Sequence, residues 1–202
     1  MKLALWRSVL AICFLSLALT SANAFGQERR ETWQPPDKIM DAVGVKPGMV
    51  IGEAGAGRGY FTFYLAERVG AEGRIYANDI SKSALDALQA RADREGVENI
   101  EIVMGEVVDP LFPEEELDMI VMVYVLHMLD RPLEFLENLK KYLAPDASLV
   151  IIEKNTDHDR GHPPSFMSKS QVLDSIQEAD YVLVRKETFL LRDTIYILNV
   201  KE

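Results

Sequence analysis

A glycine-rich turn carries the clearest chemical signal in this sequence. Residues 53–59 read Glu-Ala-Gly-Ala-Gly-Arg-Gly and stand between an apolar run and a segment with helical spacing. Glycines at alternate positions permit positive φ angles and let the backbone approach a ligand. At the N-terminus of a helix, the free amide groups then point toward that ligand. The turn therefore predicts a binding site for a small molecule.

The residues around this turn limit which ligands suit it. Tyr60 stands where the dinucleotide fingerprint needs a third small residue, which disfavours nicotinamide and flavin cofactors. No lysine followed by serine or threonine comes after the turn, so the phosphate loop of nucleoside triphosphatases is absent. Asp79, 20 residues beyond Gly59, stands where a carboxylate can accept both hydroxyls of a ribose. The alternative role for Asp79 is to cap the following helix. Together these features indicate a nucleoside without a required pyrophosphate.

The three histidines of the chain are candidates for contact with a second reactant, beside the ligand of the glycine-rich turn. His127 follows the predicted strand Leu117–Val125, whereas His158 and His162 lie in the loop after the next strand. All three fall at the edge where ligands of open α/β sheets bind. His127 is the candidate general base; the alternative is that it packs or bonds to backbone at the end of the strand. The loop 157–164 holds two histidines and two carboxylates, but we expect a solvated loop and no metal site.

A largely parallel sheet is needed to bring these residues together. Short apolar runs alternate with segments of helical period, which predicts a Rossmann-like, doubly wound α/β domain with seven mostly parallel strands and a C-terminal antiparallel hairpin. The predicted strands are Met49–Ala54, Arg74–Asp79, Ile100–Met104, Leu117–Val125, Leu149–Glu153, Tyr181–Phe189 and Thr194–Val200. The predicted helices are Pro36–Val43, Tyr60–Val69, Ser81–Arg94, Pro132–Leu143, and one from Ser168 or Ser170 to Ala179.

The N-terminus differs from the rest of the chain. Two basic residues precede the apolar run Val9–Leu19, and Ala22-Asn23-Ala24 is a small-x-small cleavage pattern. We interpret residues 1–24 as a signal peptide, with an uncleaved membrane anchor as the alternative, and residues 25–202 as a single domain. Export to the periplasm or beyond the cell is therefore expected. Cys13, the only cysteine, lies within the leader, which excludes disulfides in the processed chain.

The charge of the chain limits its partners. There are 32 acidic and 22 basic residues among 202, which gives a net charge of −10 at neutral pH. Such a surface repels nucleic acid, and the sequence has no basic run of the kind that binds anionic membranes. We expect a small-molecule partner, with membrane contact only through an uncleaved N-terminal segment. The sequence gives no indication of the oligomeric state.

The motifs together resemble those of class I S-adenosylmethionine-dependent methyltransferases. Residues 46–62 resemble the first motif of that family, and the likeness continues through residues 76–80, 105–106, 117–120 and 125–129. Exported members of unassigned substrate share the Trp-x-x-Pro beginning seen at Trp33. Two positions depart from the family pattern: Glu106 replaces the more usual aspartate, and Asp146 replaces a glycine before the fifth strand.

The resemblance implies S-adenosylmethionine as cofactor and a role for each matched residue. For the methionine end, it implies that Glu53 orients the amino group through the turn and that Gly55, Gly57 and Gly59 pass beneath methionine and ribose. For the nucleoside end, it implies that Asp79 binds the ribose hydroxyls and that Ile80 packs on adenine. It also implies that Glu106 faces the adenine amino group, with Val107 beside it. The expected activity is methyl transfer to an unidentified acceptor. The rival expectations are an exported noncatalytic module that keeps the fold and, less favoured because of Tyr60, a nicotinamide oxidoreductase.

Overall fold

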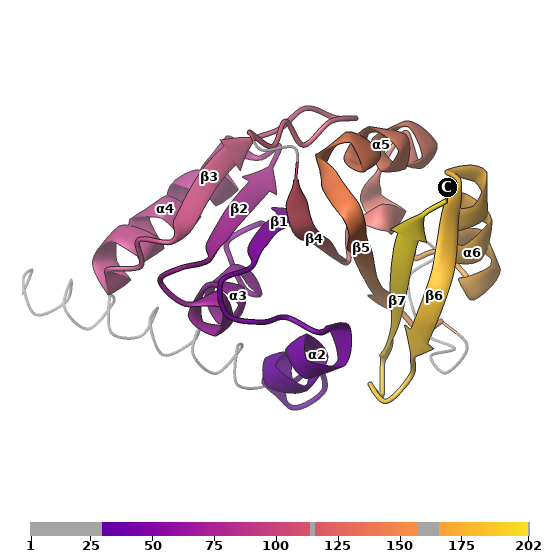
Figure 1. Ribbon diagram of the computed structural model, residues 1–202, viewed down its shortest axis with the longest axis horizontal. Helices are drawn as coiled ribbons and strands as arrows, with labels where there is room; N and C mark the ends of the chain where they lie inside the picture. The colour runs from indigo at the N-terminus through magenta and orange to yellow at the C-terminus, as the bar shows by residue number, and fades with distance from the viewer. Residues whose placement is uncertain (1–29, 114–115, 157–165, 202) are drawn as a thin grey trace, which may run out of the picture. The chain divides into compact units, whose positions relative to one another are not determined.

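The computed structural model describes residues 30–113, 116–156 and 166–201 (Figure 1). The chain divides into two compact units, Met1–Pro35 and Pro36–Glu202, and every described strand belongs to the second. The predicted leader, residues 1–24, falls outside the described part of the chain. Among the helices that are described, none is long and apolar enough to cross a membrane.

The described strands form one seven-stranded sheet in the order β3-β2-β1-β4-β5-β7-β6 (Figure 1). Strands β1 to β5 are mutually parallel, and β7 is antiparallel to both of its neighbours. The predicted Rossmann-like, doubly wound sheet with a C-terminal antiparallel hairpin is therefore confirmed. The strands are β1 (Val50–Ala54), β2 (Arg74–Asp79), β3 (Ile100–Met104), β4 (Leu117–Val123), β5 (Leu143–Lys154), β6 (Tyr181–Glu187) and β7 (Asp193–Val200).

The helices begin where the sequence places capping residues. The Ser81 hydroxyl accepts a hydrogen bond from the Ala84 amide at the start of α4, and Ser168 forms a reciprocal capping box with Gln171 at the start of α6. Pro132 occupies the first turn of α5, where it displaces no helical hydrogen bond. The helices are α2 (Pro36–Val43), α3 (Thr62–Val69), α4 (Lys82–Glu95), α5 (Pro132–Leu139) and α6 (Lys169–Glu178), with 3₁₀ turns η1 (Leu126–Met128) and η2 (Lys140–Tyr142).

Both faces of the central sheet are covered. In β5, Leu149 and Ile151 pack in a cluster with α5 and α6, whereas Val150 and Ile152 pack in a cluster with α2 and α3. All four side chains are inaccessible to solvent. This is the pattern of a strand with helices on both sides, and it leaves only the strand ends open for chemistry.

Strands β1 and β7 start one residue away from their predicted bounds, and β6 ends two residues earlier than predicted. Strands β4 and β5 also differ, at positions where the backbone has a positive φ. Strand β5 begins at Leu143 rather than Leu149, because Asp146 adopts a φ of 66° and its pairing with β4 continues past a register shift. The residues between the predicted helix and the predicted fifth strand are thus the irregular start of β5. Strand β4 ends at Val123 rather than Val125, because Tyr124 adopts a φ of 60° and turns the chain into η1.

Candidate active site

The three glycines of the turn after β1 have different surroundings. All have positive φ, at 78° for Gly55, 57° for Gly57 and 84° for Gly59. A Cβ on Gly55 would lie 2.3 Å from a methyl of Val125, and one on Gly59 would lie 2.9 Å from the ring of Phe63. A Cβ on Gly57 would meet nothing within 4 Å. Packing therefore requires the outer two glycines, whereas Gly57 faces open space in which a ligand can lie.

Asp79 joins the glycine turn to the end of β2. One carboxylate oxygen accepts a hydrogen bond of 2.9 Å from the Gly57 amide, and the other accepts one of 2.8 Å from the Ser81 amide. The Ala56 amide donates to the Asn78 carbonyl at 2.7 Å, which adds a second link between the two loops. Asp79 thus bonds the residue that caps the next helix, whereas its contact with ribose hydroxyls stays a prediction. A carboxylate has about four acceptor positions, so capacity remains for hydroxyl donors.

Glu53 lies beneath the turn rather than on its surface. It is 2% exposed, and the Thr62 hydroxyl, itself fully buried, donates a hydrogen bond to its carboxylate. A buried carboxylate requires such donors because its charge has lost its water. Thr62 was missed by the sequence reasoning, since a threonine at the start of a helix has no distinctive spacing. The expected role of Glu53 in orienting the methionine amino group through the turn stays a prediction.

An apolar rim stands beside the glycine turn. Ile80 is 61% exposed after β2, and Val107 is 46% exposed in the loop after β3. Met104, the last residue of β3, is 45% exposed and pairs in register with Asp79. Glu106 is also exposed, next to Val107. The structure thus brings the predicted Ile80, Glu106 and Val107 to neighbouring strand ends, and it adds Met104, whose place at the end of its strand was the available signal.

Buried polar groups hold the loop that carries Glu106 and Val107. The Asn78 side chain, 3% exposed, donates to the Val103 carbonyl at 3.3 Å and to the Pro110 carbonyl at 2.8 Å. A Cβ on Gly105 would lie 2.3 Å from the Asn78 nitrogen, so this approach requires glycine. Asn78 therefore ties the end of β2 to both ends of the loop.

Asp109 fixes the same loop from its other side. Its carboxylate accepts hydrogen bonds from the Tyr142 hydroxyl at 2.6 Å and from the Lys141 ammonium. Burial by itself would raise the pKa of Asp109, but the bonds from Lys141 and Tyr142 outweigh that effect and hold the pKa below its ordinary value. The carboxylate consequently stays ionised at neutral pH and keeps the loop attached to η2.

A second polar group lies at the ends of β4 and β5. Nδ1 of His127, in η1, is 2.9 Å from a carboxylate oxygen of Glu153, and the two side chains are 8% and 3% exposed. Burial raises the pKa of Glu153, while the charge and hydrogen bonds of His127 oppose that rise. Glu153 was missed by the sequence reasoning, although its position at the end of a predicted strand was an available signal. The carboxyl ends of adjacent parallel strands meet at one edge of a sheet, so a residue there lies close to His127.

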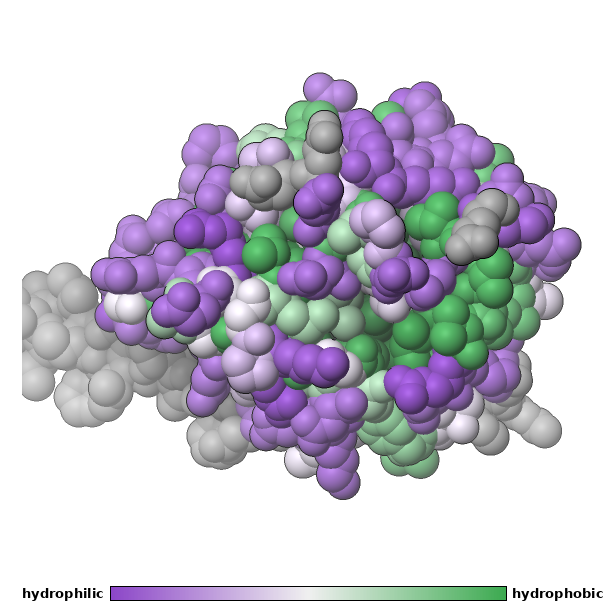
Figure 2. Space-filling view, in the orientation of Figure 1, coloured by the Kyte–Doolittle hydropathy of each residue, from purple (hydrophilic) through white to green (hydrophobic). Residues whose placement is uncertain are grey.

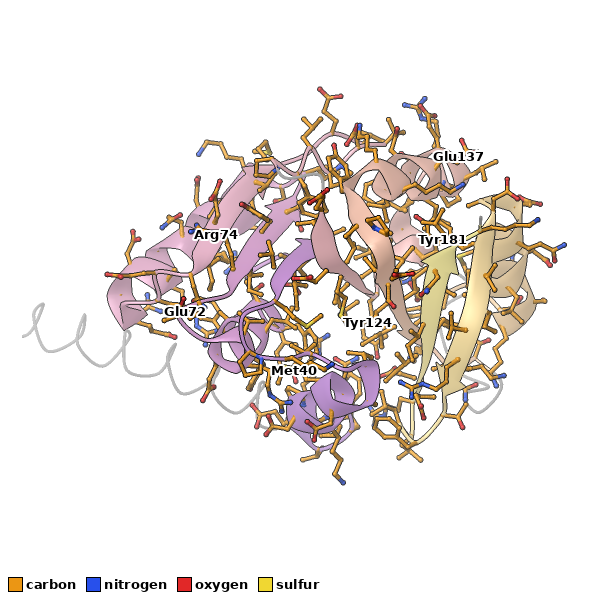
Figure 3. The ribbon with its side chains drawn as sticks, in the orientation of Figure 1. Met40, Glu72, Arg74, Tyr124, Glu137 and Tyr181 are labelled. Atoms are coloured by element: carbon orange, nitrogen blue, oxygen red, sulfur yellow. The ribbon has the colours of Figure 1, made fainter. Side chains whose placement is uncertain are left out.

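An aromatic ring packs against His127. The Phe166 ring centroid lies 4.5 Å from that of His127 and 6.4 Å from that of Tyr124. The hydroxyl of Tyr124, which is labelled in Figure 3, donates a hydrogen bond to Asp193, and Asp193 is fully buried at the start of β7. Strand β7 thereby contributes directly to the edge of the site. His127 itself is in contact with the Phe166 ring and the buried Glu153 carboxylate.

The structure shows no metal centre in the residues that it describes. Among them, no three His, Cys, Asp or Glu side chains gather closely enough to hold a metal ion. The loop containing His158 and His162 falls in the undescribed stretch 157–165, so the sequence expectation for it stays a prediction.

Comparisons with known proteins identify this combination of fold and site. The family model described as a methyltransferase domain matches residues 52–151. A solved S-adenosylmethionine-dependent methyltransferase from Aquifex aeolicus is 27% identical with a TM-score of 0.78, covering 84% of this chain and 91% of its own. The chain belongs to the class I S-adenosylmethionine-dependent methyltransferase family.

Two further relatives match the chain over different shares of its length. The demethylmenaquinone methyltransferase of Lactococcus lactis is 28% identical over 126 residues, which cover 62% of this chain and 49% of that protein. The chain thus spans about half the length of this curated relative. The Burkholderia thailandensis 1,6-didemethyltoxoflavin-N1-methyltransferase, solved with S-adenosylhomocysteine, is 19% identical with a TM-score of 0.66, covering 98% of this chain and 89% of its own. At this level of identity, the likeness shows only that the two proteins share a fold.

The residues present fit S-adenosylmethionine, the cofactor of this family. Gly57 leaves open space above the turn, Asp79 offers acceptor capacity to ribose hydroxyls, and Ile80 exposes an apolar face suited to adenine. A pyrophosphate would need a third small residue at Tyr60, whereas a nucleoside with a methionine tail does not.

Proposed function

We propose that this protein transfers a methyl group from S-adenosylmethionine to an aromatic small molecule that loses a proton in the reaction. One observation carries the proposal: His127 Nδ1 lies 2.9 Å from the buried Glu153 carboxylate, at the edge next to the cofactor turn. If the site only bound a nucleoside, it would have no need of a buried, oriented imidazole there. The demethylmenaquinone methyltransferase relative and the rings of Tyr124 and Phe166 support an aromatic acceptor.

Each group has a proposed role in the transfer. S-adenosylmethionine, when bound, would supply an electrophilic methyl group, and direct displacement by the acceptor would break the sulfur–methyl bond and release S-adenosylhomocysteine. Nδ1–H of His127 donates to Glu153, which leaves Nε2 unprotonated and able to accept the proton of the acceptor. The Glu153 carboxylate then stabilises the imidazolium that forms. Tyr124 and Phe166 limit water around the reacting atoms and align a flat acceptor.

We further propose that the protein works outside the cytoplasm. The support is the leader-like segment of residues 1–24, with its basic start, apolar run and small-x-small pattern. Intact mass measured on the periplasmic and membrane fractions tests this. Cleavage would give a soluble chain that begins at Phe25, and a full-length mass in the membrane fraction would instead show a retained anchor.

Calorimetric titration tests the cofactor assignment first. The chain from Phe25 should bind S-adenosylmethionine and S-adenosylhomocysteine at micromolar concentrations and should not bind NAD. Transfer of labelled methyl to a reduced naphthoquinone probe then tests the acceptor class. Cofactor binding without methylation of any aromatic probe would favour the rival hypothesis, a noncatalytic exported module. Failure to bind the cofactor would contradict the proposed function and would likewise favour the noncatalytic module.

A further inference from the structure

The hairpin between β6 and β7 exposes apolar side chains that no core uses. Leu190 at its tip is 4% exposed and packs in the cluster with α2 and α3, whereas Phe189 and Leu191 on either side of it are 47% and 76% exposed. Because the buried Leu190 fixes the tip, Phe189 and Leu191 can face solvent without making the tip flexible. Apolar exposure continues along β6 at Val182 and Val184. Figure 2 shows hydrophobic residues gathered over β6 and β7.

We infer that this hairpin surface, made of Val182, Val184, Phe189 and Leu191, docks on an anionic lipid bilayer. Its local charge is opposite to that of the whole chain. Segment 185–192 carries three basic residues and one acid, whereas the chain has a net charge of −10. The single acid of this segment pairs with one of the three basic residues at 3.1 Å, which leaves an excess of positive charge. Exposed apolar residues beside cations match the headgroup region of a bilayer that contains acidic lipids. The surface comes from β6 and the loop after it, where the cations are interspersed with apolar residues and form no basic run.

The connection to the N-terminal segment favours the same occupant. Helix α2 begins at Pro36, and the Arg185 guanidinium of β6 donates a hydrogen bond to the Ala42 carbonyl of α2. The apolar run Val9–Leu19 therefore joins the domain at a helix that is bonded to this hairpin. A leader retained in a membrane would therefore tether the domain to that membrane through α2.

A second copy of this chain suits the surface less well. Strand β6 lies at the edge of the sheet, but its pairing with β7 is interrupted by a bulge between Leu183 and Arg185. Arg185 and Lys186 follow directly on the exposed edge. Bulges and cations on an edge strand oppose the addition of another strand.

The docked face lies next to the proposed acceptor edge. The Asn155 amide after β5 donates to the Arg192 carbonyl at 2.7 Å, and Asp193 accepts from Tyr124. A hollow of about 540 Å³ is lined by Asn155, Lys169, Thr188, Phe189, Leu190 and Leu191. Docking would bring this hollow to the bilayer, which is a route for a lipid-soluble acceptor. That consequence rests on the proposed function, whereas lipid binding itself does not.

Vesicle sedimentation tests the inference. All residues of the three apolar clusters lie between Ile39 and Leu198, so the chain from Phe25 retains the whole core and isolates the hairpin from the leader. We expect it to sediment with vesicles of equal parts phosphatidylcholine and phosphatidylglycerol, less with phosphatidylcholine alone, and less in high salt. The double variant Phe189→Ser, Leu191→Ser should lose binding about tenfold or more.

Matched controls separate docking from folding and from catalysis. Leu133→Ser alters another exposed apolar residue, on α5, and should leave vesicle binding unchanged. Titration with S-adenosylhomocysteine should give equal affinity for the parent chain and the double variant, which shows that the site is intact. Absence of vesicle binding by the parent chain, or equal binding by the double variant, would overturn the inference. So would a dimer of the parent chain that the double substitution dissociates.

Discussion

The Gly57 amide donates a hydrogen bond of 2.9 Å to the Asp79 carboxylate, so the glycine turn and the end of β2 act as one binding element. Replacing Asp79 by Ala removes this bond and the acceptor for the ribose hydroxyls. We expect cofactor affinity to fall by about 2 kcal/mol, or roughly 30-fold, as for a lost charge-assisted pair. Calorimetry with S-adenosylhomocysteine measures the change.

Asp86→Ala is the matched control for this substitution. Asp86 is exposed on α4 and is paired only with Lys82 among the described residues, away from the turn. It should leave cofactor affinity unchanged. Unchanged affinity in the Asp79 variant would refute the ribose assignment.

Alanine at Gly55 and at Gly57 should have different effects. At Gly55 the new methyl would lie 2.3 Å from buried Val125, and the positive φ adds strain, so we expect a loss of about 2–4 kcal/mol in the free energy of unfolding. At Gly57 the space is open, so only the conformational cost of about 1 kcal/mol applies. There the loss should instead fall on cofactor affinity. Urea unfolding and calorimetry together measure both, and equal destabilisation by the two variants would contradict this division.

The His127–Glu153 pair should control turnover without affecting the cofactor. His127→Asn removes the proposed base and should slow turnover about 10²- to 10⁴-fold. Glu153→Gln retains the shape but weakens the orientation of His127, so we expect a smaller loss together with a shifted pH profile. Calorimetry should find cofactor affinity near that of the parent chain in both variants. A parent-like rate in the His127 variant would retire that residue as a base.

The stability of the protein should depend on pH through Glu153. Burial raises the pKa of this carboxyl above its ordinary 4.5, so the native state holds the proton more tightly than the unfolded chain does. The resulting stabilisation is complete below pH 4.5 and is lost as pH rises through the raised pKa. The free energy of unfolding of the parent chain, minus that of Glu153→Gln, should therefore fall across this window. Urea unfolding at several pH values measures it, and a difference that grew with pH would indicate a lowered pKa.

Asn78 should matter for both stability and cofactor binding. Replacing it by Ala leaves the Val103 and Pro110 carbonyls without their donor, which costs about 1–3 kcal/mol and loosens the loop bearing Val107. Asn99→Ala is a matched control, because its side chain also donates to two carbonyls, those of Ala66 and Gly70. Thermal unfolding should show a loss for both variants. Only the Asn78 variant should also weaken S-adenosylhomocysteine binding; retention of full affinity would exclude a positioning role.

The sequence predicted the parallel half of the fold closely because that half depends on local patterns. Arg74–Asp79 and Ile100–Met104 were placed at their observed bounds, since each is an apolar run bounded by turn residues. Strand β5 was placed too short, because its irregular start depends on the left-handed Asp146 and on pairing with β4. The pattern of apolar residues along one segment does not indicate how that segment pairs with a neighbouring strand.

The candidate site was predictable to a similar degree. Gly57 and Asp79 belong to a recognisable turn and strand end, and the structure places them in contact. Glu153 and Thr62 were missed because their roles come from partners 26 and 9 residues away, His127 and Glu53, which only folding brings within bonding distance. Buried polar partners of this kind leave little trace in a single sequence.

The division of the sheet has a consequence for how such a protein can diversify. The predicted cofactor contacts come from the loops after β1, β2 and β3, whereas the proposed acceptor contacts come from the ends of β4 and β5 and from Asp193 of β7. An exchange of the β6–β7 hairpin between homologues would therefore change one reactant's environment and spare the other's. A change of acceptor specificity, whether by design or by natural recombination, is therefore best sought in that C-terminal segment.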